Sequence, residues 1–263
     1  MNESRHNGAM ASLRRIRLIA RHTLGEALRM RLTLLLGLVG AALVFAALWL
    51  REFNFGAAEL KFIGDFGLGA LGFFGMLLAA LATAQLFFNE IAGGAICCVL
   101  ARPVRRGEYI WGQFIGVAAL LALFTAALGA LVALLLVWRG TQLGAASLAL
   151  PVFLGACAVQ WLKMTLVAAL TLLVCTYAGS ALFSSCAGLL LTLIAHMRPF
   201  VGESGRMAWL RLWPNLALFD AEALLASGQS SSGAVLLGLV AYWAAYVFVL
   251  GVLASYVFKH REF

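Results

Sequence analysis

Long apolar runs alternate with short polar segments along this chain. Runs of about 20 or more apolar residues, the length that crosses a bilayer core as a helix, lie at 32–50, 66–89, 110–137, 150–176, 178–197 and 234–258. Only residues 176–180 separate the fourth run from the fifth. We keep these two runs as separate helices, because their combined length is too great for one crossing. The pattern predicts an all-α membrane protein with six transmembrane helices.

Residues 12–31 have an amphipathic pattern instead. Apolar side chains recur at helical spacing, at Leu13, Ile16, Ala20, Leu24 and Ala27. Arg14, Arg17 and Arg21 lie elsewhere around the helix, and Ser12 is a candidate N-cap. The pattern predicts a helix in the inner membrane interface, with its arginines toward anionic lipid or an acidic partner. A simple positively charged anchor would explain the same arginines, so both roles stay open.

The distribution of Lys and Arg predicts the orientation of the chain, since short cytoplasmic segments carry the excess. Basic residues concentrate in the N-terminal tail, in the connection after the second run and at the C-terminal end, 259–263. These three segments lie on one side if the chain crosses six times. We therefore expect both termini in the cytoplasm and the protein in the inner (plasma) membrane. The net charge of +8 then reflects topology, and no nucleic-acid partner is expected.

Composition and motifs argue against chemistry of the chain's own. Charged residues make up 11% of the chain, against roughly 25% in soluble domains, so most of the surface must face lipid. The H-E-x-x-H, G-x-S-x-G and P-loop patterns are absent from the sequence. The five cysteines have neither a disulfide framework nor a metal-ligand spacing. We expect a non-catalytic chain with no catalytic, cofactor or metal site, and ATP hydrolysis in another protein.

Two features inside the predicted spans stand out. Lys163 is the only basic residue well inside one of them. A charged group at the bilayer centre costs at least ~2.5 kcal/mol, so Lys163 should face the helix bundle or snorkel to the outer leaflet. A bundle-facing Lys163 would be a candidate pathway residue. In the second run, Gly67, Gly69, Gly72 and Gly75 permit close helix approach, which internal packing explains better than a dimer seam.

The segment 90–109, between the second and third runs, combines charges with turn residues. Gly93 and Gly94 can end or bend the preceding helix, and Pro103 can start a new short one. A short cytoplasmic helix held parallel to the membrane could transmit force from a soluble partner, whereas a simple turn would explain only the arginines. We expect a coupling helix here, with the candidate residues Glu90, Gly94, Arg102, Pro103, Arg105, Arg106 and Glu108.

The connection 198–233, between the fifth and sixth runs, is too long for a simple turn. Its tryptophans and leucines with scattered charges predict short external helices that lie at, or dip into, the outer interface. The candidate residues in this external loop are Trp213, Pro214, Asn215 and Asp220.

The segment 90–109 and its context resemble the transmembrane permease subunits of type 2 ABC transporters, especially the six-span subgroup that includes the permease serving nitrous oxide reductase maturation. These proteins carry a Glu, then Gly-Thr-Ile, then Leu-(Ser/Ala)-(Arg/Lys)-Pro-Val-Ser-Arg-x-Glu, then Gly-Lys-(Phe/Tyr)-Leu-Gly. The matching residues here are Glu90, Gly94, Ile96, Leu100, Ala101, Arg102, Pro103, Val104, Arg106, Glu108, Gly112, Phe114 and Gly116. Ala95, Arg105 and Gln113 depart from the pattern. The segment 212–220 lies where that subgroup has a similar external sequence.

The resemblance implies the transmembrane subunit of an ABC exporter. A separate cytoplasmic ATPase would bind ATP and Mg, and its closure would move the segment 90–109. A second permease copy or a paralogue would complete the substrate path. The domains are then the tail and interfacial helix, 1–31, the permease domain, 32–258, and the cytoplasmic end, 259–263.

Three other functions stay open. A secondary transporter would need its own coupling-ion site. An intramembrane enzyme would need Glu90, His196 or Lys163 to be catalytic. A membrane scaffold would have partners but no ATP-dependent change. The scarcity of polar groups in the spans favours a hydrophobic or amphiphilic cargo, or a mechanical role, over a small ion.

Overall fold

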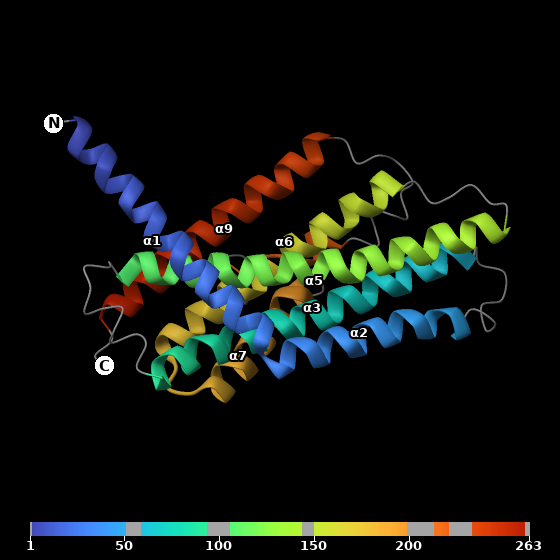
Figure 1. Ribbon diagram of the computed structural model, residues 1–263, viewed down its shortest axis with the longest axis horizontal. Helices are drawn as coiled ribbons and strands as arrows, with labels where there is room; N and C mark the ends of the chain where they lie inside the picture. Colours follow the sequence, from blue (N-terminus) through green and yellow to red (C-terminus); the bar gives the residue numbers. More distant parts are fainter. Residues whose placement is uncertain are drawn as a thin grey trace, which may run out of the picture.

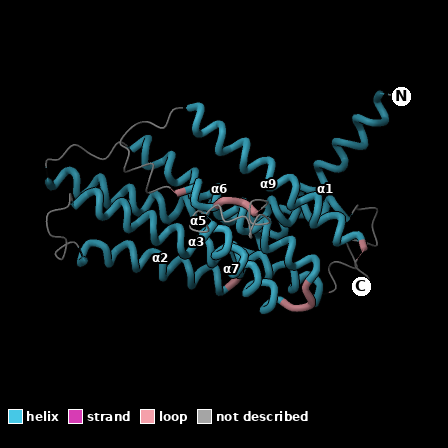
Figure 2. The backbone as a smooth tube through the Cα atoms, turned by 180° about the vertical axis from the view of Figure 1, so that it is seen from behind, coloured by secondary structure: helices cyan, strands magenta, loops and turns pink. Residues whose placement is uncertain are grey.

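A computed structural model describes residues 2–50, 59–93, 106–143, 150–198, 213–220 and 233–260. All regular structure in these ranges is helical, and no strand occurs among them (Figure 2). The prediction of an all-α protein is confirmed for this part of the chain. The elements are α1 (Asn2–Arg29), α2 (Arg31–Leu50), α3 (Glu59–Ala92), α5 (Arg106–Leu143), α6 (Leu150–Tyr177), α7 (Ala181–Met197), the 3₁₀ helix η4 (Leu216–Phe219) and α9 (Gly233–Lys259).

Four helices, α3, α5, α6 and α9, are each long and apolar enough to cross a membrane. A fifth candidate span consists of α1 and α2 taken together, and these two are bent by 62° at their junction. The apolar helix α7 is shorter, with 17 residues. The chain is therefore a multi-pass membrane protein with four to five candidate spans, and six remains a prediction.

The centre of the bundle consists of α3, α5 and α6, which pack against one another (Figure 1). On this centre, α2 packs against α3, α7 against α6 and α3, and α9 against α6 and α5. The central helix α6 is apolar on nearly all sides and buried along most of its length, as expected of a helix without a polar face. By contrast, α9 exposes most of its apolar side chains, as a lipid-facing helix would.

Glycines let the central helices approach closely, as predicted for the second run. A Cβ added at Gly67 would lie 2.7 Å from Val132 on α5, and one added at Gly75 would overlap Met164 on α6. Both glycines therefore serve packing within one chain. Gly72 likewise faces α6, where the amide of Gln160 fills the space that a Cβ would need.

The helix α1 lies across α5, and its N-terminal part projects away from the bundle (Figure 1). The predicted apolar face is correct in part, because Ala20 and Ala27 are buried whereas Leu13 is exposed. Ser12 is not an N-cap, since the helix begins ten residues earlier at Asn2 and Ser12 lies inside it. The two ends of the described chain lie toward the same end of the molecule (Figure 1).

We expect Gly116→Ala to destabilise the protein. The added Cβ would lie 2.7 Å from the Cβ of Thr23 and 2.8 Å from the carbonyl oxygen of Ala20, so α1 would have to move off α5. Overpacking of this kind costs about 1–3 kcal/mol. The measurement is the thermal unfolding midpoint of the detergent-solubilised chain.

Gly25→Ala is the matched control, because an added Cβ at this position of α1 has nothing within 4 Å. It should raise the unfolding midpoint slightly, since Ala stabilises a helix by about 0.5–1 kcal/mol relative to Gly. Equal midpoints for the two variants would contradict the close approach of α1 and α5.

Candidate functional site

The first turns of α5 hold three other helices at one end of the bundle. Arg106 contacts the end of α9, Glu108 binds α1, and Tyr109 reaches the end of α3. These residues follow directly after the predicted coupling segment. We call this meeting point of α1, α3, α5 and α9 the α5 junction, and define it by Arg15, Glu90, Arg106, Glu108 and Tyr109.

Glu108 binds α1 through a two-pronged ion pair. The Nε and Nη2 atoms of Arg15 each donate a hydrogen bond of 2.9 Å to a different oxygen of the Glu108 carboxylate. The hydroxyl of Ser12 donates a third bond of 2.7 Å. The Glu108 side chain is only 7% exposed, and charge-assisted pairs of this geometry are among the stronger protein hydrogen bonds.

Glu90 joins the end of α3 to α5. Its carboxylate is buried and accepts a hydrogen bond from the Tyr109 hydroxyl. The Thr23 hydroxyl of α1 lies 3.5 Å from the other Glu90 oxygen, but its shorter bond goes to the carbonyl of Ile19. The Tyr109 ring stacks on Phe258 of α9, with a centroid distance of 5.7 Å. Glu90 and Tyr109 therefore connect α3, α5 and α9.

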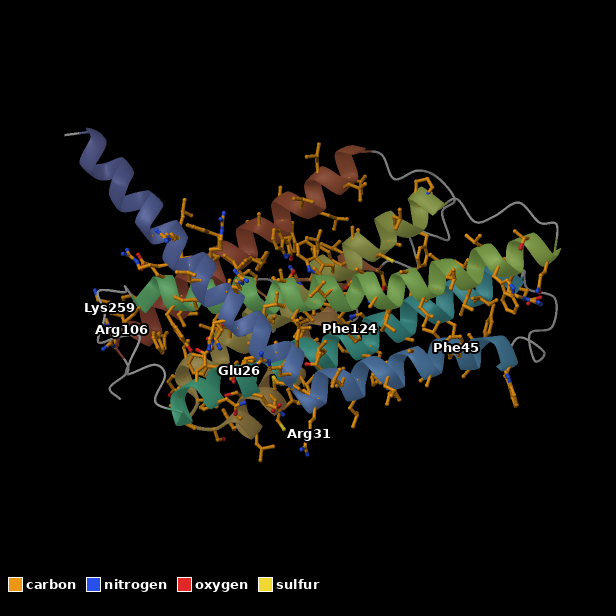
Figure 3. All side chains as sticks on the ribbon, in the orientation of Figure 1. Glu26, Arg31, Phe45, Arg106, Phe124 and Lys259 are labelled. Atoms are coloured by element: carbon orange, nitrogen blue, oxygen red, sulfur yellow. The ribbon has the colours of Figure 1, made fainter. Side chains whose placement is uncertain are left out.

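Arg106 holds the end of α9 against the same point. Its Nη1 donates to the carbonyl oxygens of Phe258, at 3.3 Å, and Lys259, at 2.8 Å. The last carbonyls of a helix carry partial negative charge, which a cation stabilises. Figure 3 shows Arg106 and Lys259 side by side at this end of the molecule.

The α5 junction also gathers three potential metal ligands. His22 and Glu26, one turn apart on α1, bring their ligand atoms within 4.8 Å of each other and of Glu90. Imidazole and carboxylate groups in this combination could hold a divalent cation such as Zn²⁺. The sequence predicted no metal site. Glu90 is far from His22 and Glu26 in the sequence, and only the packing of α1 on the bundle brings the three side chains together. One oxygen of Glu90 already accepts the bond from Tyr109.

Only part of the predicted coupling segment lies within the described residues. The helix α3 ends at Ala92, and the N–H of Gly93 donates to the carbonyl of Asn89 at 2.8 Å, so the predicted helix end at Gly93 is confirmed. Arg106 and Glu108 are in the first turn of α5 and not in a separate short helix. The remaining candidates lie outside the described residues: Gly94, Arg102, Pro103 and Arg105.

The arginines singled out on α1 are not the one that binds the bundle. Arg14, Arg17 and Arg21 are exposed, which leaves them accessible to lipid or an acidic partner. Arg15 forms the ion pair instead. Its position four residues before Ile19 and eight before Thr23 is the signal that could have found it, because that spacing puts all three on one helix face.

A second cluster of polar groups lies in the middle of the bundle. The Lys163 side chain is 4% exposed, and its Nζ is 3.5 Å from an Asp220 oxygen. Lys163 is 14 residues from the end of α6 at Tyr177, about 21 Å along the helix. The side chain is buried, so it faces the bundle as one of the two predictions expected, and its role as a pathway residue stays a prediction.

The predicted external residues explain how Asp220 is held beside Lys163. The carbonyl of Trp213 accepts a 2.7 Å bond from Arg198, and the N–H of Asn215 donates to the Tyr242 hydroxyl at 2.8 Å. Asn215 also caps η4, since its side chain accepts from the N–H of Ala217. Pro214, Leu216 and Phe219 are buried whereas Leu218 and Asp220 are exposed, so one side of the segment 213–220 packs against the bundle and the other side stays at its surface. Its place at the outer interface stays a prediction.

A cavity of about 270 Å³ adjoins the Lys163–Asp220 pair. We call it the polar cavity. Its lining residues come from α3, α6, α7 and the segment 213–220: Leu68, Gly69, Gly72, Phe73, Met76, Gln160, Lys163, His196 and Asp220. Of the three residues that an intramembrane enzyme would need, Lys163 and His196 share this cavity, whereas Glu90 belongs to the α5 junction.

Neither a protein-family model nor a curated protein matches the chain.

We expect Tyr109→Phe to destabilise the protein by about 1–3 kcal/mol. The substitution removes the hydroxyl that donates to the buried Glu90 carboxylate, and an acceptor that loses its buried donor costs this much. The thermal unfolding midpoint in detergent measures the effect. Tyr256→Phe, an exposed position of α9, is the matched control and should leave the midpoint unchanged. A Tyr109→Phe midpoint equal to that of the control would contradict the Glu90–Tyr109 contact.

Proposed function

We propose that this chain is the transmembrane permease subunit of an ABC transporter. It would cross the inner membrane six times with both termini in the cytoplasm. A separate cytoplasmic ATPase would supply ATP hydrolysis, and a second permease copy or a paralogue would complete the substrate path as an exporter. The observation that carries the proposal is the α5 junction, which joins four helices beside the segment 94–105.

The contacts at the α5 junction suit force transmission. The segment 94–105 runs from Gly93, at the end of α3, to Arg106, at the start of α5. A partner that moved this segment would therefore pull directly on two central helices. The Arg15–Glu108 ion pair would carry the movement to α1, and Arg106 would carry it to α9.

An ATPase at this position would have to bind the two transport states with different affinity, because only differential binding shifts a conformational equilibrium. The exposed Arg14, Arg17 and Arg21 of α1 offer a second contact for an acidic surface of that partner or for anionic lipid. A partner in contact with both the segment 94–105 and α1 could change the angle between α1 and the bundle when nucleotide closes it.

A secondary transporter is the second candidate. The observation in its favour is the Lys163–Asp220 pair, since ionisable groups inside a membrane bundle often mark ion or substrate pathways. Transport by the purified chain alone, driven by a proton gradient, would support this candidate over the ABC subunit.

The test of the ABC proposal is affinity purification of the tagged chain in mild detergent, followed by identification of co-purifying proteins and an ATPase assay. We expect an ATPase to co-purify. Arg102→Glu, within the predicted coupling segment, should reduce its recovery about tenfold, which corresponds to ~1.4 kcal/mol of binding. Variants of Glu90 and Arg106 are less informative, because both residues hold the bundle together.

Lys61→Glu is the matched control. It makes the same change of charge at an exposed position at the start of α3, the opposite end of that helix from Glu90. Its ATPase recovery should equal that of the wild type. Recovery of the chain without any nucleotide-binding protein, under conditions that preserve a known ABC complex, would contradict the proposal.

A further inference from the structure

We infer that the polar cavity binds the anionic group, a carboxylate or a phosphate, of an amphiphilic ligand, and that this group replaces Asp220 beside Lys163. The inference goes beyond the ATPase-coupled function, because it concerns a ligand of this chain itself. It holds whichever source of energy drives the protein.

The first step is the charge of Lys163. A cation with a side-chain exposure of 4% must be paired, because an uncompensated buried charge is costly. Asp220 lies 3.5 Å away, longer than the usual 2.7–2.9 Å of a charge-assisted hydrogen bond. The Asp220 side chain is also 52% exposed. Lys163 is therefore fixed inside the bundle. The Asp220 carboxylate, in contrast, can move away from Lys163 into solvent and stay hydrated.

The second step is the set of donors that remains around the space. His196 lines the same cavity, and its buried Nδ1 has no hydrogen-bond partner within the described part of the chain. Gln160 adds an amide to the lining. An anionic oxygen between Lys163 and His196 would pair with the ammonium and would accept a hydrogen bond from His196, in the tautomer that carries a proton on Nδ1. Asp220 already supplies an anion to Lys163, but not a hydrogen-bond acceptor to His196 Nδ1.

The third step is the shape and polarity of the cavity. Leu68, Phe73 and Met76 of α3 form an apolar wall beside the charged groups, and Phe73 is exposed at the surface of the helix. A volume of about 270 Å³ is below the roughly 300–1,000 Å³ of pockets that enclose a whole drug-sized ligand. The cavity therefore suits the headgroup of an amphiphile whose apolar chain lies along α3.

The test measures equilibrium binding of a fluorescent dodecanoate to the purified full-length chain in a neutral maltoside detergent. Lys163→Gln should weaken binding at least tenfold, because the ligand loses its cation. Asp220→Asn should tighten binding several-fold, because the competing internal anion is removed while the size of the side chain is kept. The methyl ester of the same probe should not bind, since it carries no charge.

Glu59→Gln is the matched control. It neutralises an acid of a different ion pair, in which Glu59 lies 2.7 Å from Arg139, and should leave the affinity unchanged. Unchanged or weaker binding by Asp220→Asn would overturn the inference, and so would equal binding of the ester and the acid. If Lys163→Gln does not give a monodisperse protein, the Asp220→Asn measurement decides alone, because Asp220 is half exposed.

Competition distinguishes the two sources of the anionic group. Displacement of the probe by inorganic phosphate would support an anion site served by a soluble compound. Displacement only by dodecyl phosphate would support one served by a membrane amphiphile. The assay contains no ATPase, so a negative result would leave the ABC proposal standing, and the absence of an ATPase partner would leave this site standing.

Discussion

The ion pair between Glu108 and Arg15 is the contact on which the arrangement of the helices depends. A carboxylate that is 7% exposed, at the start of an apolar helix, is stable only if a partner compensates its charge. The partner comes from α1, which must therefore lie across α5 with Gly112 and Gly116 beneath it. Once α1 is fixed, Thr23 and Glu26 lie near Glu90, and the end of α3 joins the same cluster.

The same physical rule operates halfway along the bundle. Most helix contacts here join apolar side chains, and such packing tolerates many substitutions of similar volume. A buried charge is more selective, because a misplaced partner leaves it uncompensated. Lys163 accordingly pairs with Asp220, and the bonds of Trp213 and Asn215 hold the segment 213–220 against the bundle.

The sequence predicted where the helices lie along the chain, but not which helices contact one another. The predicted runs 32–50 and 234–258 agree closely with α2 and α9, because the apolar pattern ends where these helices end. The run 66–89 was too short, since α3 begins with the polar turn around Glu59, which pairs with Arg139. Periodicity identifies a helix face but not the helix that covers it. For this reason neither the role of Arg15 nor the pairing of Asp220 with Lys163 could be predicted.

The α5 junction and the polar cavity share α3. Glu90 lies near one end of this helix, and Gly72, in the cavity wall, lies 18 residues away, about 27 Å along the axis. Because α3 is a continuous helix, a tilt imposed at Glu90 would displace the wall against Gln160, which already fills the space above Gly72. If a partner binds at the junction and an anion binds in the cavity, this displacement would link their binding free energies, and the linkage would be reciprocal. The bound anion would change the affinity for the partner by the same factor as the partner changes the affinity for the anion. Such a linkage requires two discrete arrangements of α3 that both ligands bias. The Glu90–Tyr109 contact at the junction and the packing of Gly72 against Gln160 at the cavity are the contacts of α3 that would differ between them.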